Sequence, residues 1–228
     1  MSDSGGARPN SPALHPDLAE ELLSSLTRWT VDASVPLAHR LMELGDEGAL
    51  ASYDAMALGH PDTAGLLEDR YLSPTPEIEE LAVMDEGSLG RAFADYITTN
   101  NLNVAQLRES AFIEAHARRG DDIGHLAERG FQLHDMFHVL TGYDTSPLGE
   151  VRVVSFTVAQ FPAPYPAMVM TSRPLQMALY EPALLPFVMD AVAEGWILGR
   201  AADPLISVRW EDHWEKPLAD LRASHGLD

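Results

Sequence analysis

The sequence predicts an all-α protein whose helices form one bundle-like domain, and three observations support this. Apolar residues recur at helical spacing along most of the chain. The one strand-like run, residues 151–161, has no second run with which to pair, and a lone strand cannot form a stable sheet. With 228 residues, 46% hydrophobic and 22% charged, the chain has the size and composition of one substantial globular domain.

The N-terminal quarter divides into a tail and short helical segments. Residues 1–16 are polar and rich in Gly and Pro, so we expect a disordered tail before a single helical domain at residues 17–228. Hydrophobic spacing predicts helices over residues 17–29, 37–44 and 53–58. The last of these ends at the breaker sequence Gly-His-Pro at residues 59–61.

The middle of the chain reads as an extended connector followed by three helices. The Ser-Pro-Thr-Pro sequence at residues 73–76 is too rich in proline for a helix. Ser88 is a suitable cap for a helix that runs to Asn100 with Leu89, Phe93, Tyr96 and Ile97 facing inward. We expect a further helix over residues 104–118, then a long one that begins at residues 120–122 and ends at Gly142.

The C-terminal third is predicted to be helical as well. Valines at residues 151–158 favour a strand by propensity, but the missing partner strand makes a helix the better interpretation. Residues 175–198 read as one or two buried helices, broken near Pro182 and Pro186. Residues 210–221 carry Trp210, Trp214, Leu218 and Leu221 on one side, as in an amphipathic helix.

Charge and composition exclude several functions. The net charge is −20 and the pI about 4.6, so a nucleic acid backbone would be repelled. The chain has no cysteine, so a metal must be held by nitrogen and oxygen ligands. The N-terminus lacks the apolar core of a signal peptide, and residues 183–199 read as too short and too polar to span a bilayer. We therefore expect a cytoplasmic protein.

One segment carries the residue types of a metal site. His134 and His138 are one helical turn apart, so both imidazoles can reach one ion. Asp135 falls in the same wedge of the helix, and the turn-forming residues 144–149 can bring Glu150 back to the same point. These four residues are our candidate ligands and catalytic groups, for Zn²⁺ first and for Fe²⁺ or Mn²⁺ as alternatives.

Other interpretations of this segment compete. A His pair at this spacing also arises by chance, and Asp135 is shorter than the Glu that acts as base in HExxH metalloproteases, which disfavours a protease. A His-Asp phosphohydrolase would need a further upstream His and a distant Asp. Candidates exist, but their spacing fits poorly: His116 or His125 upstream and Asp190 or Asp203 downstream.

The stretch HDMFHVLTGYDTSPLGEV resembles the hallmark HDxxH-x11-E of the fourth protein family in the coenzyme Q (ubiquinone) biosynthesis series. Residues 85–94, DEGSLGRAFA, resemble the family's PEGTLGRAYA stretch, and residues 210–222 resemble its C-terminal helix. The resemblance spans roughly residues 18–227. Residues 69–74 depart from it, since they read DRYLSP where the family often has Arg-Pro-Arg. No basic transit peptide precedes the domain, so the chain resembles a prokaryotic member.

The resemblance implies an α-helical fold, a divalent metal, usually zinc, at the four candidate ligands, and affinity for long prenyl chains. It implies metal-dependent decarboxylation, oxidative or not, at C1 of a polyprenylated hydroxybenzoate. A non-catalytic, prenyl-lipid-binding scaffold of a biosynthetic complex is the alternative, and the phosphohydrolase is the third. A scaffold could hold the metal as a structural ion.

The remaining expectations concern ligands and partners. An apolar groove for the prenyl tail would draw on Met168, Val169, Met170, Met177, Leu184, Leu185, Phe187, Met189 and Trp196, although ordinary core is the more frequent role of such residues. Arg91 could bind a carboxylate or pyrophosphate, or form a surface salt bridge. Further expected partners are other quinone-biosynthesis enzymes, a second copy in a homodimer, and the inner face of the plasma membrane.

Overall fold

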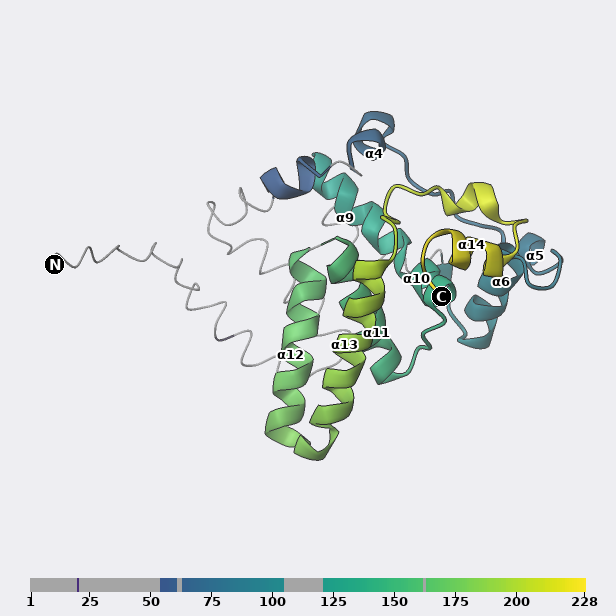
Figure 1. Ribbon diagram of the computed structural model, residues 1–228. Helices are drawn as coiled ribbons and strands as arrows, with labels where there is room; N and C mark the ends of the chain where they lie inside the picture. Colours follow the sequence, from purple (N-terminus) through teal and green to yellow (C-terminus); the bar gives the residue numbers. More distant parts are fainter. Residues whose placement is uncertain (1–19, 21–53, 61–62, 105–120, 162) are drawn as a thin grey trace.

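The structure, a computed structural model, describes residues 20, 54–60, 63–104, 121–161 and 163–228. In these residues it is helical and without a strand, apart from one isolated antiparallel bridge between Ser88 and Pro217 (Figure 1). The predicted all-α class is confirmed. The predictions for residues 1–16, 17–29, 37–44 and 105–118 lie outside the described residues.

The described residues form a series of helices. They are α4 (Ala64–Asp69), α5 (Ile78–Leu81), α6 (Leu89–Thr99), α9 (Asp122–Gln132), α10 (His134–Thr141), α11 (Pro147–Gln160), α12 (Pro164–Tyr180), η2 (Pro182–Leu184), α13 (Leu185–Ala201), η3 (Trp210–His213) and α14 (Leu218–Ser224). A helical turn also covers residues 54–58, within the predicted helix at 53–58. Residues 71–77, which include the connector predicted at 73–76, form neither helix nor strand.

Two helices match their predictions closely. Helix α6 begins after Ser88, whose side chain accepts a hydrogen bond from the Arg91 backbone N–H at 3.2 Å, and it ends at Asn100. Helix α11 contains the valine-rich run that propensity alone would make a strand. Val153 and Phe156 are fully buried there, so packing against other helices outweighs local strand preference.

Three predictions needed correction, two of them on helix continuity. The long helix ending at Gly142 is divided at Leu133 into α9 and α10. The predicted helix over residues 210–221 is also divided, because backbone carbonyls in its middle accept hydrogen bonds from the N-terminus of α6. The Trp214 and Lys216 carbonyls accept hydrogen bonds from the Gly90 and Leu89 backbone N–H groups, at 2.8 and 2.9 Å. These carbonyls satisfy the N-terminus of α6, and Pro217 cannot continue a helix.

The third correction concerns residues 175–198, which are helical but largely exposed rather than buried. The exposed apolar side chains of the α12–α13 hairpin, here called the hairpin patch, are Leu175, Leu179, Tyr180, Leu184, Phe187, Met189, Trp196 and Ile197. By length and composition Pro182–Ala201 is also apolar enough to cross a membrane, contrary to expectation, with a mean hydropathy of 1.2 and 22% of the window buried. One such helix does not establish a membrane span.

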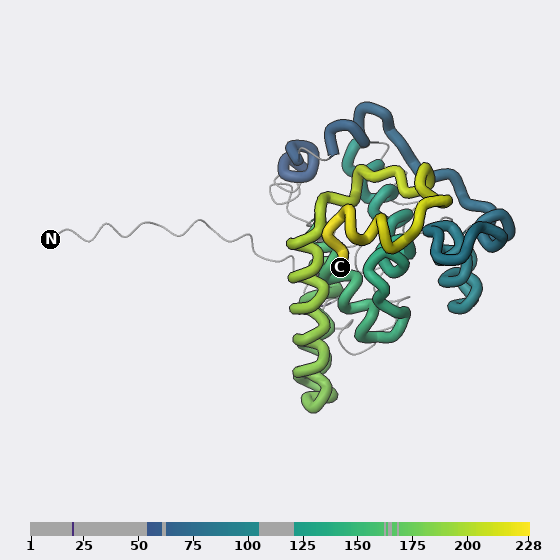
Figure 2. The backbone as a smooth tube through the Cα atoms, turned by 45° about the vertical axis from the view of Figure 1, so that its right-hand side comes forward, coloured from purple at the N-terminus to yellow at the C-terminus, as the bar shows by residue number. Residues whose placement is uncertain are grey.

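Helix α10 lies at the centre of the described structure (Figures 1 and 2). It contacts α6, α9, α11 and α14, while α11, α12 and α13 pack together as the three longest helices. The main core surrounds α10 and includes Phe93, Phe137, Leu140, Phe156 and Trp210. A helix held on so many sides is a rigid base for side chains that must keep a fixed geometry.

A buried arginine joins α9 to the segments on either side of it in sequence. Arg129 is fully buried and donates to the Val208 carbonyl at 2.7 Å, to Glu211 at 3.2 Å and to the Ser73 hydroxyl. The Tyr71 hydroxyl also donates to Glu211, and burial together with that carboxylate raises the pKa of Tyr71 to about 12. This network ties the extended connector and η3 to α9, directly before α10.

Close packing of α11 on α13 depends on small residues. A Cβ added at Gly195 would lie 2.1 Å from the Arg152 carbonyl oxygen, and one at Gly199 would lie 2.7 Å from the Phe156 carbonyl oxygen. Ala191, one turn earlier on the same face, is fully buried. The two backbones therefore approach closely along one stripe of α13.

We predict that Gly195→Ala destabilises the protein by about 1–3 kcal/mol, because the methyl group forces the α11 and α13 backbones apart. Urea unfolding of the full chain measures this. Gly130→Ala is the matched control, since a Cβ at Gly130 meets nothing within 4 Å. It lies within a helix, where Ala is favoured over Gly by about 0.5–1 kcal/mol, so stability should rise slightly. Equal losses in both variants would contradict the close-packing argument.

Candidate metal centre

Helix α10 presents two histidines from one face, and its C-terminal end is held by hydrogen bonds from α14. Arg222 of α14 donates from Nε to the Leu140 carbonyl and from a terminal nitrogen to the Val139 carbonyl, both at 2.8 Å. These carbonyls belong to the last turn of α10, which has no intrahelical partner for them. Gly142 then ends the helix with a φ of 76°, in the left-handed region where glycine is favoured.

The chain reverses between α10 and α11 over a short, internally bonded turn. The Asp144 carboxylate accepts from the Ser146 hydroxyl at 2.6 Å, and the Ser146 oxygen accepts from the Gly149 backbone N–H at 3.1 Å, which caps α11. Gly149 is required by space, because a Cβ there would lie 1.9 Å from the Asp144 carbonyl oxygen. Glu150 follows directly, in the first turn of α11.

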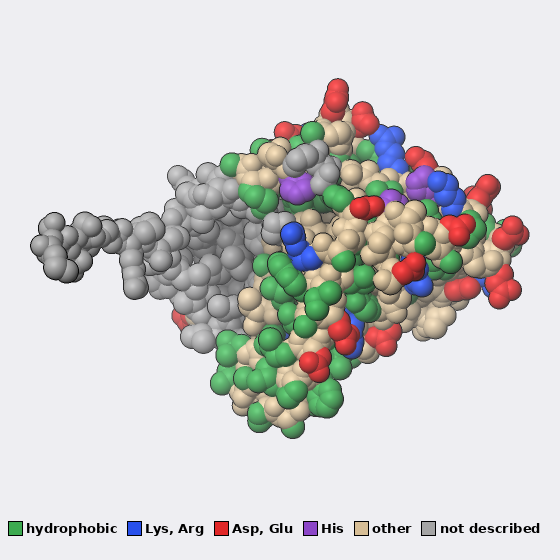
Figure 3. All heavy atoms as spheres, viewed as in Figure 1, with side chains coloured by type: hydrophobic (Ala, Val, Ile, Leu, Met, Phe, Trp, Pro, Cys, Tyr) green, Lys and Arg blue, Asp and Glu red, His purple; other side chains and the backbone are tan. Residues whose placement is uncertain are grey.

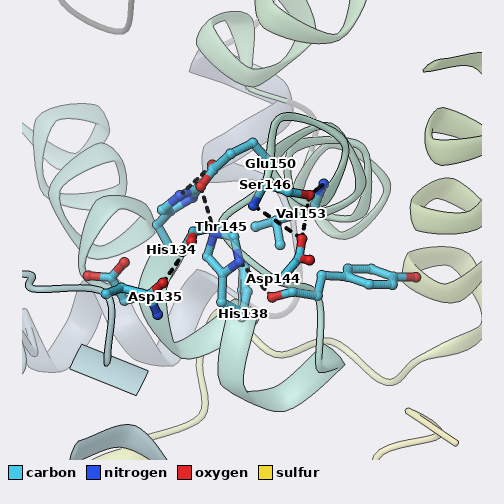
Figure 4. A network of polar contacts seen from close by, with 12 residues as sticks. His134, Asp135, His138, Asp144, Thr145, Ser146, Glu150 and Val153 are labelled. Atoms are coloured by element: carbon cyan, nitrogen blue, oxygen red, sulfur yellow. Dashed lines mark hydrogen bonds and ion pairs between the residues drawn. The ribbon is translucent and has the colours of Figure 1, made fainter. Parts of the chain in front are cut away.

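This reversal brings three of the four predicted ligands together (Figure 4). The Nε2 atoms of His134 and His138 each lie 3.4 Å from a different oxygen of Glu150. The potential ligand atoms of these three residues lie within 4.8 Å of one another. His138 is fully buried, whereas about 40% of the His134 and Glu150 side chains is exposed. The site therefore has a closed inner side and an accessible outer side.

The state of His138 fits a metal better than a simple hydrogen bond. Its Nδ1 lies 2.9 Å from the Tyr143 carbonyl oxygen, which can only accept, so Nδ1 carries the proton. In the neutral ring Nε2 is then a buried lone pair without a hydrogen-bond partner, facing a carboxylate oxygen, whereas a protonated ring would form an ion pair with Glu150. Two ligands about 2.0–2.1 Å from a tetrahedral ion are about 3.3 Å apart, close to the separations seen here.

The charges of the three residues are mutually dependent. Burial raises the pKa of Glu150, but its interactions with His134 and His138 outweigh burial and lower it to about 2. Burial lowers the pKa of His134, but Glu150, helped by the charge of Asp135, outweighs it and raises the pKa above 6.5. Glu150 is therefore ionised at neutral pH, the form in which a carboxylate binds a metal.

Asp135 is the fourth predicted ligand, and its carboxylate does not join the cluster formed by the other three. It accepts a hydrogen bond from the Tyr96 hydroxyl, with 3.4 Å between the oxygens. Tyr96 comes from α6, and its ring stacks on the His138 imidazole with centroids 5.4 Å apart and planes 23° apart. Sequence reasoning placed Tyr96 inward on this helix but assigned it no part in the site.

The candidates of the phosphohydrolase alternative that lie within the described residues do not come together. His125 is buried on α9, Asp190 is exposed on α13 and Asp203 is exposed beyond it, and within the described residues none of them joins a metal-binding group. His116 lies outside the described residues. Arg91 forms an exposed ion pair with Asp95 at 2.9 Å, one turn along α6, so it matches the surface salt bridge.

An apolar pocket of about 160 Å³ lies beside the first turn of α11. Its lining is apolar except for Arg173, and comprises Pro147, Leu148, Val151, Arg173, Met177, Leu184, Phe187 and Val188. Three of the nine predicted tail-groove residues, Met177, Leu184 and Phe187, are among them. The other candidates lie elsewhere on α12 and α13, and the Met168 side chain is outside the described residues.

Two imidazoles and a carboxylate on an all-helical scaffold define a candidate metalloprotein with nitrogen and oxygen ligands. Comparison with known families then gives the specific assignment. Residues 48–228 match the model of the coenzyme Q (ubiquinone) biosynthesis protein Coq4. The chain belongs to this family, as its HDxxH-x11-E motif predicted.

Individual relatives agree with the family match. The bovine "ubiquinone biosynthesis protein COQ4 homolog, mitochondrial" is 26% identical over 169 residues, and the human homologue is 25% identical over 169 residues. Each alignment covers 73% of this chain but 61% of the relative, so the chain spans less than two thirds of their length. A solved structure from Nostoc punctiforme, provisionally named as a ubiquinone biosynthesis protein, shares the fold. Its TM-score is 0.74 at 23% identity, over 92% of this chain and 95% of that one.

We predict that the purified chain binds about one Zn²⁺ or Co²⁺, and that His134→Ala/His138→Ala abolishes this binding because two of three clustered ligands are lost. Elemental analysis by mass spectrometry and metal titration measure it. His60→Ala is the control, since His60 packs against Phe161 and is outside the cluster. Retention of metal by the double variant would contradict the site.

Gly149→Ala should weaken metal binding about 10-fold or more without unfolding the protein, because the methyl group displaces the turn that places Glu150. Co²⁺ titration and circular dichroism measure the two effects. Gly65→Ala, where a Cβ meets nothing within 4 Å, should bind Co²⁺ normally. Normal Co²⁺ affinity in Gly149→Ala would show that the turn geometry does not control the site.

Proposed function

We propose that this chain acts in ubiquinone or related quinone biosynthesis as a metal-dependent carboxy-lyase, removing the C1 carboxylate of a polyprenylated hydroxybenzoate. Membership of the Coq4 family supports a role in the ubiquinone biosynthesis pathway. The observation that carries the reaction is the double role of the first turn of α11. Glu150 faces the two histidines, while Leu148 and Val151 line the apolar pocket. A polar reaction centre and an apolar pocket on one helical turn suit a substrate with a charged head and an apolar tail.

Each part of the centre has a distinct task in this proposal. His134, His138 and Glu150 hold a divalent metal, with zinc expected first and iron or manganese as alternatives. The bound ion supplies Lewis-acid stabilisation of negative charge that develops on the aromatic head. Fully buried His138 fixes the inner side, so the head group enters from the exposed side formed by His134 and Glu150.

The pocket holds the prenyl tail in this proposal. Met177 and Phe187 provide flexible and aromatic apolar surface, and Arg173 is the one cation at the lining. The pocket lies between the first turn of α11 and the α12–α13 hairpin, whose exposed apolar side chains gather at the lower end of the molecule in Figure 3. The hairpin patch is apolar throughout, which supports peripheral contact with a membrane that contains the lipid substrate.

The cellular setting follows as part of the same proposal. A cytoplasmic protein that touches the inner face of the plasma membrane could receive the substrate from the bilayer and pass it to other quinone-biosynthesis enzymes. The hairpin patch offers the contact surface, and a homodimer is an alternative use of it. The scaffold function is the second candidate, and it needs the pocket but not turnover at the metal.

We predict that the metal-loaded chain releases CO₂ from a short-chain prenylated 4-hydroxybenzoate under air. His134→Ala should lower this rate at least 100-fold while tail binding stays within about 3-fold, because the ligand and the pocket are separate. Phe187→Asp should weaken tail binding about 10-fold or more by placing a charge in the pocket. Glu77→Gln, an exposed carboxylate outside both sites, is the control. Tail binding without CO₂ release in the metal-loaded wild type would favour the scaffold.

A further inference from the structure

Arg222 on α14 is a half-buried cation whose donors end on the backbone of α10 rather than on a carboxylate. Its Nε donates to the Leu140 carbonyl and a terminal nitrogen donates to the Val139 carbonyl, both at 2.8 Å. These two residues directly follow His138 in the chain. In the part of the chain that the structure describes, no carboxylate forms an ion pair with Arg222. Its donors are therefore directed at the C-terminal end of the helix that carries both histidines.

We infer that Arg222 is a positioning residue of the metal centre on α10 and α11. By holding the last turn of α10, it fixes the Tyr143 carbonyl, which in turn orients the His138 imidazole. This inference rests on the proposed metal-dependent function and concerns how the chain maintains the centre. It gives a role to residues 210–222, whose resemblance to the C-terminal helix of the family the proposed function does not use.

The last turn of α10 lacks donors of its own for two of its carbonyls. The Gly142 N–H donates to the His138 carbonyl at 2.9 Å. In many helices that end at a glycine, the next N–H also bonds back to the last turn. Here the Tyr143 N–H donates to the Thr141 hydroxyl instead, at 3.3 Å. The two carbonyls that directly follow His138 in sequence therefore depend on Arg222.

The same turn leads directly to the group that orients His138. The Tyr143 carbonyl lies 2.9 Å from His138 Nδ1, and Tyr143 is only three positions beyond Leu140. A Cβ added at Gly142 would lie 3.2 Å from a terminal nitrogen of Arg222, so the guanidinium packs against this residue as well. Without Arg222 the turn would fray and the Tyr143 carbonyl would shift relative to the imidazole. Loss of a group that orients a metal-binding histidine typically lowers metal affinity by about 10- to 100-fold.

Charge and shape both favour arginine at this position. The C-terminus of a helix carries partial negative charge on its unpaired carbonyls, so a cation there is stabilising. The planar guanidinium of Arg222 directs two N–H groups at two neighbouring carbonyls at once. A lysine has the charge but lacks this fixed pair of donors.

Helix α14 is fixed on both sides of Arg222, so the side chain approaches α10 from a defined direction (Figure 1). At the start of α14, the Leu218 N–H donates to the Gly87 carbonyl at 2.8 Å. Leu221 and Leu227 are buried and belong to the main core. The Leu227 N–H also donates to the Arg222 carbonyl at 2.9 Å, which secures the backbone at Arg222 itself.

Co²⁺ titration of the full-length chain, followed by visible absorption, tests the inference. Arg222→Met has a side chain without donors, so it should weaken Co²⁺ binding about 10-fold or more and alter the ligand-field spectrum. Arg222→Lys keeps the charge and can serve one carbonyl, so its loss should be smaller, about 3-fold. Arg209→Met is the matched control, since Arg209 pairs with Asp69 at 2.6 Å and lies over the Tyr71 ring. It should bind Co²⁺ normally.

A second control separates positioning from stability. Arg222→Met leaves two carbonyls without a donor, so it should also lower the free energy of unfolding. Leu66→Ala removes a buried side chain from α4, which packs on α9, and should lower the free energy of unfolding too. Urea unfolding measures this effect in each variant. Leu66→Ala should nevertheless keep the wild-type Co²⁺ affinity and spectrum.

The outcomes separate the inference from the proposed function. Wild-type Co²⁺ affinity and spectrum in both Arg222 variants would overturn the positioning role, while the metal centre would stand. An equal loss of Co²⁺ affinity in Leu66→Ala would show a general effect of stability and overturn it as well. If Arg222→Met does not fold by circular dichroism, Arg222→Lys decides. Failure of the wild type to bind Co²⁺ would remove the proposed metal-dependent function, and this inference with it.

Discussion

The reversal of the chain between Gly142 and Ser146 is the constraint on which the site depends. A left-handed residue ends α10, the Asp144 carboxylate bonds to Ser146, and Ser146 caps α11. The space for this arrangement exists because Gly149 lacks a side chain. Glu150 is thereby set opposite two histidines that precede it by twelve residues or more. Any distortion of this turn would separate carboxylate from imidazole, whatever the state of the surrounding helices.

Helix α11 connects this turn to the rest of the protein. One side of its first turn faces the histidines, and another side lines the apolar pocket. In its later turns, α11 packs closely on the glycines of α13. The other wall of the centre comes from α6, through the Tyr96 ring. The candidate centre therefore forms where α6, α10 and α11 meet, and packing of these helices in the core fixes the positions of its side chains.

Local signals in the sequence predicted some elements well and others poorly. Ser88 and Asn100 marked the ends of α6 correctly because capping depends on nearby residues. The prediction of one continuous helix over residues 210–221 was wrong, because the Trp214 and Lys216 carbonyls accept hydrogen bonds from the distant N-terminus of α6. The exposed α12–α13 hairpin was expected to be buried because its sequence is apolar. Apolar composition does not show whether another part of the protein packs over a helix.

The sequence by itself determined the fold class, the family and the residue types of the candidate metal centre, because helical periodicity and the spacing of His134, His138 and Glu150 are local properties of the chain. Tertiary structure decided the rest. The Tyr143 carbonyl sets the tautomer of His138. The Tyr96 hydroxyl, on a helix nearly forty residues earlier in the chain, donates a hydrogen bond to the Asp135 carboxylate. These contacts join segments whose separation in sequence carries no periodic signal, so they exist only once the helices have packed.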